Sequence, residues 1–122
     1  MVLRQGMTFW LVAIGGAIGS ALRYYSYSAF GARPLTTFAV NISGSFLIGI
    51  LAAATNNTNA RVFLGTGILG GFTTFSAWQL EAFTSSQHKA GAATALTILF
   101  GSLAVGFAAC WCGYALGQRL FR

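Results

Sequence analysis

The chain has 122 residues, of which 56% are hydrophobic and 7% are charged, and its formal net charge is +6. Soluble domains carry about 25% charged residues, so this composition excludes an ordinary water-facing surface and points to the lipid bilayer as solvent. The mean hydropathy of +0.70 agrees with that reading. We therefore predict an integral membrane protein with a single domain covering residues 1–122.

Four long apolar runs alternate with short polar segments along the chain. Each run can cross the hydrocarbon core of a bilayer, which takes about 20 helical residues. The predicted spans are roughly residues 8–29, 36–54, 62–83 and 91–116. The pattern predicts an all-α membrane protein with four transmembrane helices.

The first two runs contain small residues and one amide. The spacing of Gly15 and Gly19 in the first run lets two helices approach closely within lipid. In the second run, Asn41 carries a side chain that must form hydrogen bonds inside the membrane. This amide either joins two helices or contacts something that passes through the protein.

The third run carries the sequence GGFTTFSAW at residues 70–78. Gly70 and Gly71 weaken a helix, whereas Thr73, Thr74 and Ser76 are residue types that cap a restarting one. The run is therefore predicted to be two half-helices joined by an irregular turn. Irregular backbone at membrane depth is tolerated only where it is buried in protein or lines a wet cavity. Its free carbonyls suit a cation and the start of the second half-helix suits an anion, so we predict an ion site.

Aromatic and acidic side chains follow this predicted break. Phe75 and Trp78 are three residues apart and share a helix face. They either pack in a core or an aromatic belt, or they turn their electropositive ring edges toward an anion. Glu81, the only acidic residue, follows one turn later. It is either an interfacial anchor or a titratable group near the mouth of a pore.

The sequence shows no set of residues suited to catalysis, so we predict that the protein is not an enzyme. His88 is the only histidine, and Cys110 and Cys112 are two residues apart, which points them away from each other on a helix. The positive charges flank the apolar runs, so lipid headgroups or anion attraction explain them better than nucleic acid does.

The basic residues are distributed almost evenly between the two sides of a four-span protein. The two groups are Arg4, Arg61, Arg119 and Arg122 on one side and Arg23, Arg33 and Lys89 on the other. The positive-inside rule gives little bias for four charges against three. The chain either has one topology with weak signals or inserts in both orientations, which would permit an antiparallel dimer.

The segment GGFTTFS at 70–76, together with AVNISGSFLIG at 39–49 and GGAIGSALRY at 15–24, resembles the Fluc fluoride channel family, also called CrcB. The likeness covers nearly the whole chain. It implies passive, fluoride-selective export across the cell membrane, in bacteria the inner membrane. It also implies an antiparallel, dual-topology dimer with two pores, either a homodimer or a heterodimer with a homologous subunit.

The resemblance also implies roles for particular residues. A structural sodium ion would bind the backbone carbonyls of Gly70 and Thr73 at the dimer axis. Arg23 matches the arginine that ends the first span, with a vestibule or structural role. The residues expected at the fluoride pore are Asn41, Thr74, Phe75, Ser76, Trp78, Glu81 and Ser102.

Two positions depart from the family pattern. Trp78 stands where the second pore aromatic is usually phenylalanine, and Ile98 stands where many relatives carry tyrosine or histidine. The indole of Trp78 would narrow the path or hold an anion more tightly.

Two other classes of function are alternatives to a channel for a small membrane protein of this kind. A small four-span, dual-topology exporter of drugs or cations needs a carboxylate in its first span, and this chain has none there. A membrane scaffold packed through its glycines would transport nothing.

Overall fold

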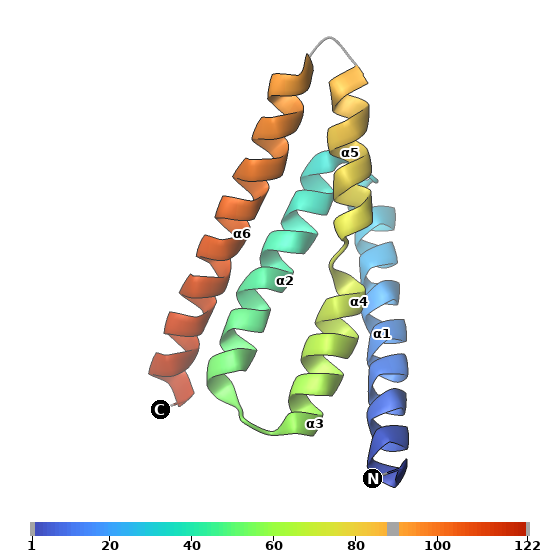
Figure 1. Ribbon diagram of the computed structural model, residues 1–122, viewed down its shortest axis with the longest axis vertical. Coiled ribbons are helices and arrows are strands. Elements are labelled where there is room, and N and C mark those ends of the chain that lie inside the picture. The colour runs from blue at the N-terminus through green and yellow to red at the C-terminus, as the bar shows by residue number, and fades with distance from the viewer. Residues whose placement is uncertain (1, 88–90, 122) are drawn as a thin grey trace.

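The computed structural model describes residues 2–87 and 91–121, so His88 and Lys89 lie outside the described residues (Figure 1). No strand occurs in the described part of the chain, and the predicted all-α class is confirmed. The helical elements are α1 (Val2–Phe30), α2 (Pro34–Ala54), α3 (Thr58–Ala60), the π-helix η1 (Arg61–Leu69), α4 (Gly70–Phe72), α5 (Phe75–Gln87) and α6 (Gly91–Phe121).

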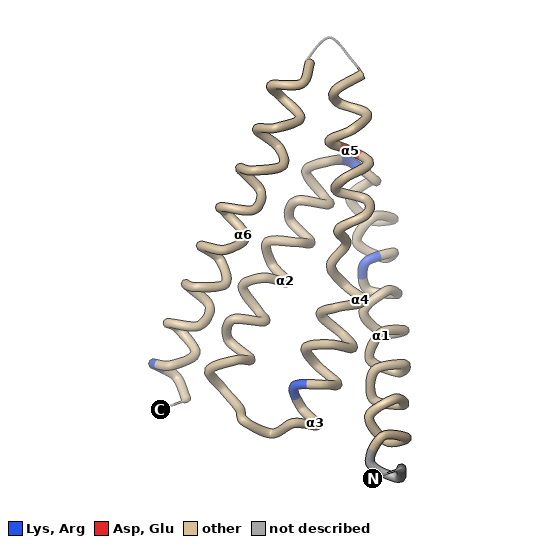
Figure 2. Tube along the Cα trace, in the orientation of Figure 1, with Lys and Arg blue, Asp and Glu red and all other residues tan. Residues whose placement is uncertain are grey.

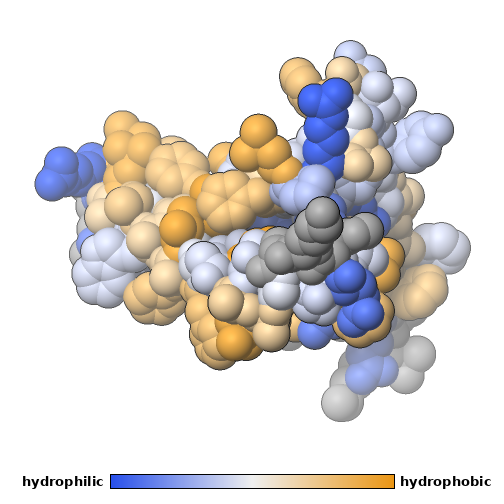
Figure 3. All heavy atoms as spheres, turned by 90° about the horizontal axis from the view of Figure 1, so that it is seen from above, coloured by the Kyte–Doolittle hydropathy of each residue, from blue (hydrophilic) through white to orange (hydrophobic). Residues whose placement is uncertain are grey.

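Within the described residues, three helices are long and apolar enough to cross a membrane. They cover Gln5–Phe30, Pro34–Ala54 and Gly91–Phe121, in agreement with the first, second and fourth predicted spans. Large apolar side chains are exposed along them, and such side chains cover much of the surface seen in Figure 3. A surface of this kind faces lipid or another protein, which agrees with a multi-pass membrane protein.

The third apolar run is interrupted, as predicted. Elements η1 and α4 follow one another, and a short non-helical connection then leads into α5 (Figure 1). The break lies within the predicted stretch 70–76: Gly70 and Gly71 remain helical, and the backbone leaves the helix at Thr73, with φ −76° and ψ 157°. The Thr73 N–H still donates to the Leu69 carbonyl at 3.0 Å, so the first half-helix is complete up to that residue.

Close approach between helices explains the small residues of the first run. A Cβ atom added to Gly19 would meet the Ile68 carbonyl oxygen, and one added to Gly71 would lie 2.5 Å from the carbonyl oxygen of Gly16. The first half of the interrupted run is therefore held against α1 by backbone contact. Helix α2 packs in the same way against α6, where a Cβ at Gly113 would meet the Phe46 carbonyl.

The positions of the basic residues differ in one respect from the expected ones (Figure 2). Arg23 does not end the first span, because α1 continues to Phe30 and the Arg23 guanidinium reaches the interruption in the third run. Arg61 begins η1, directly after α3, which lies at the end of the molecule that also holds the two chain termini (Figure 1). Arg119 lies in the last turn of α6.

Candidate functional site

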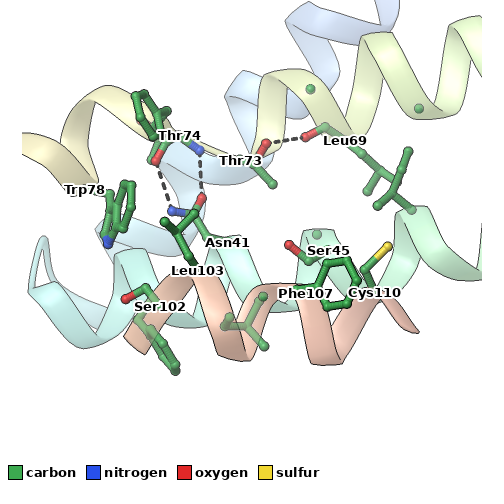
Figure 4. A pocket seen from close by; sticks show the side chains of 18 residues that line it. Asn41, Ser45, Leu69, Thr73, Thr74, Trp78, Ser102, Leu103, Phe107 and Cys110 are labelled. Carbon is green, nitrogen blue, oxygen red and sulfur yellow. Dashed lines mark hydrogen bonds between the residues drawn. The ribbon is translucent and has the colours of Figure 1, made fainter. Parts of the chain in front are cut away.

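A cavity of about 780 Å³ adjoins the interruption. It is lined by Asn41 from α2, by Gly70, Thr73, Thr74, Phe75 and Trp78 from the interrupted run, and by Ser102 from α6 (Figure 4). The fold therefore brings together most of the residues that the sequence predicted for an ion site.

The side chain of Asn41 holds the interrupted backbone in place. Its Oδ1 accepts a hydrogen bond from the Thr74 N–H at 2.8 Å, and its Nδ2 donates to the Thr74 carbonyl at 3.0 Å (Figure 4). Both backbone polar groups of Thr74 are thus paired without water. Because the amide NH₂ has two hydrogens, Asn41 keeps a second donor for other contacts.

The two threonines at the interruption have separate tasks. The Thr73 hydroxyl donates to the Leu69 carbonyl at 3.0 Å and completes the end of the preceding helix. The Thr74 hydroxyl accepts from the Ala77 N–H at 3.3 Å and caps the first turn of α5. The capping role predicted for Thr74 is confirmed, whereas Thr73 closes the earlier helix.

The backbone carbonyls of Gly70 and Thr73 at the interruption differ in their hydrogen bonds. The Thr74 N–H bonds to Asn41 in place of the Gly70 carbonyl, which it would reach in an unbroken helix. The Thr73 carbonyl accepts from Arg23 Nη1 at 2.9 Å. One of the two carbonyls that were expected to bind a cation therefore already accepts a hydrogen bond from a guanidinium.

The two aromatic residues of α5 lie in different surroundings. Their ring centroids are 5.2 Å apart with an interplanar angle of 50°. Phe75 is 63% exposed, so its ring is open to another chain or to lipid, while Trp78 is only 7% exposed. In the part of the chain that the structure describes, the Trp78 Nε1 atom is the buried side-chain polar atom that has no hydrogen-bond partner.

Glu81 belongs to a second polar group, away from the lining of this cavity. Its carboxylate accepts from the Thr37 hydroxyl at 2.5 Å, and Tyr27 lies 3.2 Å from the same hydroxyl oxygen. Thr37 is 1% exposed. The Thr37 hydrogen is engaged by Glu81, so Tyr27 is the donor in the second contact.

Sequence reasoning missed Thr37 and Tyr27. A hydroxyl in an otherwise apolar run was the available signal for Thr37, because a polar group inside a membrane needs a partner. Ser76, Glu81 and Arg23 do not line the cavity, and Ser76 is exposed on α5.

The chemistry of the site is that of uncharged donors and backbone carbonyls. Within residues 2–87 and 91–121, no group of three or more His, Cys, Asp or Glu side chains lies together. The amide of Asn41 and the hydroxyl of Ser102 can donate to a small anion, while the carbonyls of the interruption can face a cation. Together, the fold and the site define a helical membrane protein built around an interrupted helix with an uncharged polar cavity.

Comparison with known proteins identifies the family of the chain. The family model described as "CrcB-like protein, Camphor Resistance (CrcB)" matches residues 10–114. The chain therefore belongs to the CrcB family, as the resemblance of its motifs indicated.

Individual relatives agree over almost their full length. The chain is 48% identical to a "Fluoride-specific ion channel FluC" of Agrobacterium fabrum over 91% of this chain and 96% of the relative. It is 42% identical to the protein of the same name from Paracoccus denitrificans, over 93% and 97% of the two chains. The protein of that name from Thermus thermophilus is 43% identical over 92% and 94%.

Proposed function

We propose that this protein is a fluoride-selective channel that lets fluoride leave the cell passively across the bacterial cell membrane. The observation that carries the proposal is the position of the Asn41 amide, which lies in the cavity wall at the interruption and keeps one N–H free of the Thr74 carbonyl. The relatives named as fluoride-specific channels support the same conclusion.

Fluoride holds its hydration water strongly, so a pore must replace that water with donors. The Asn41 amide, the Ser102 hydroxyl and the ring edges of Phe75 and Trp78 offer such contacts. Because these groups are uncharged, they compensate for lost hydration without trapping the ion. Conduction needs release as well as entry, and a fixed cation in the path would oppose release.

The finer architecture of the proposal is a single membrane domain that crosses the bilayer four times and pairs with a second, antiparallel copy. The interrupted run would be the third crossing. Phe75 is exposed in the single chain yet borders the cavity, so a partner covering this face would enclose the path. Two copies related by a two-fold axis would form two equivalent pores. A homologous subunit in place of the second copy would give the same arrangement.

A structural sodium ion at the interruption is part of the proposal. The Gly70 carbonyl is released from its helical partner, and the Thr73 carbonyl has a second lone pair beside the one facing Arg23. Two such subunits would supply four oxygens, and the bound ion would fix the two interrupted helices relative to each other. Arg23 would then have a structural role, holding the Thr73 carbonyl in its orientation.

The experiment that tests the proposal is fluoride efflux from liposomes containing the purified protein. We expect efflux that is driven by a potassium gradient with valinomycin, that is selective over chloride, and that falls when the protein is prepared in sodium-free buffer. Equal chloride and fluoride fluxes would rule out a fluoride-selective channel. Proton-coupled movement of a cationic drug would support an exporter, and absence of any transport would support a scaffold.

A further inference from the structure

The indole of Trp78 combines deep burial with an unused donor. The side chain is 7% exposed and lines the cavity, yet Nε1 has no hydrogen-bond partner among the described residues. Buried tryptophan N–H groups normally have a partner, because a buried donor without one loses its hydration and gains nothing in return. A phenylalanine would fill this position without that cost. The N–H therefore needs an explanation beyond packing.

The surroundings of this donor are those of an anion site. In Figure 4 the Trp78 nitrogen points to the side of the cavity where Ser102 of α6 lies, and both residues line the same space. The Ser102 hydroxyl has no hydrogen bond to the residues in 2–87 and 91–121. No carboxylate lines the cavity, so nothing negatively charged competes with an anion there. Lipid is a poor partner for these groups, since acyl chains offer no acceptor.

We propose that the Trp78 Nε1–H is a fluoride-binding donor in this protein, acting with the Ser102 hydroxyl between α5 and α6. This inference rests on the proposed channel function and adds a residue that determines affinity. A hydrogen bond to a charged partner is stronger than one to a neutral partner, so the indole N–H holds fluoride more firmly than a ring edge does.

A donor at this position strengthens fluoride binding and slows conduction. A donor that strengthens binding in the path lowers the fluoride concentration at which flux saturates, and it slows release. A variant without the N–H should bind fluoride more weakly while the path stays open. The half-saturating fluoride concentration should rise at least about tenfold, which is the scale of one hydrogen bond to a charged group.

The first test observes the donor directly in the native protein. Nuclear magnetic resonance of ¹⁵N-labelled protein in nanodiscs gives one indole signal for each tryptophan, and the chain has three. Trp10 and Trp111 are 63% and 68% exposed and serve as internal controls. We expect added sodium fluoride to shift the Trp78 indole proton downfield in a saturable manner. Sodium chloride should not shift it, and the two control signals should not move.

The second test measures flux in variants. Trp78→Phe and the replacement of Trp78 by benzothienylalanine, which keeps the shape of indole but has sulfur in place of N–H, should both raise the half-saturating concentration. Trp111→Phe, at an exposed position, should leave it unchanged.

The outcomes separate the two proposals. Wild-type protein that moves no fluoride would contradict the channel function itself. Wild-type protein that conducts fluoride, with a Trp78 signal that stays fixed and an unchanged half-saturating concentration in the benzothienylalanine protein, would overturn only the role of the indole.

Discussion

Replacing Asn41 with aspartate tests whether the residue that holds the interruption also faces the permeating ion. The change is nearly isosteric. Aspartate keeps an oxygen for the Thr74 N–H, which donates to Asn41 at 2.8 Å, but it sets a second oxygen against the Thr74 carbonyl, where Nδ2 now donates at 3.0 Å. It also adds a negative charge to the cavity wall.

The expected magnitude follows from that charge. Two unit charges about 4 Å apart interact by about 4 kcal/mol at an effective dielectric constant of about 20. That energy corresponds to a reduction in fluoride entry of about 10³-fold. Efflux from liposomes, followed with a fluoride electrode, measures this reduction.

The variant Asn41→Ala separates the two roles of the side chain, because it leaves the Thr74 N–H and carbonyl without their partner and adds no charge. It should lower the free energy of unfolding by about 1–3 kcal/mol and reduce flux less than aspartate does. A flux for Asn41→Asp within threefold of wild type would remove Asn41 from the path.

Three further variants test other parts of the structure. Phe75→Ile removes an aromatic edge from the cavity and should reduce fluoride efflux at least about tenfold; wild-type efflux would refute the role of the ring. Thr37→Val keeps the shape of the side chain but leaves Glu81 without its 2.5 Å donor. It should lower the free energy of unfolding by about 1–3 kcal/mol, with Thr37→Ser near wild type, and equal stability of all three proteins in a thermal unfolding assay would contradict the contact. Gly19→Ala would force α1 from the interrupted run and should cost about 1–3 kcal/mol, whereas Gly6→Ala, with open space around it, should be neutral in the same assay.

Much of the architecture was predictable because it follows from local composition. Long apolar runs and short polar connections define most of the helices without reference to neighbouring segments. The loop position expected for Pro34 was wrong, because Pro34 is the first residue of α2. The interruption was also predictable, because glycine, threonine and serine have low helix propensities and cluster here inside an apolar run.

The location of the interruption was harder to predict. Propensity favours breaking the helix at Gly70 and Gly71, but tertiary contacts outweigh it there. Gly71 packs against the backbone of Gly16 and stays helical, while the Asn41 amide pairs with the backbone of Thr74 and stabilises a break at that position. The position of Arg23 was missed for a similar reason, because a basic residue near the end of an apolar run normally marks a membrane boundary.

The sequence by itself determined that this protein lies in a membrane, that its third apolar run is irregular and which uncharged polar residues are available to an ion. Composition and spacing carry that information. Only the tertiary structure decided how those residues are used. Asn41 and Thr74 are 33 positions apart and Arg23 and Thr73 are 50 apart, yet each pair forms a hydrogen bond. Partners at such separations meet only after the helices have packed, and the same packing buries the Trp78 N–H without a hydrogen-bond partner among the described residues.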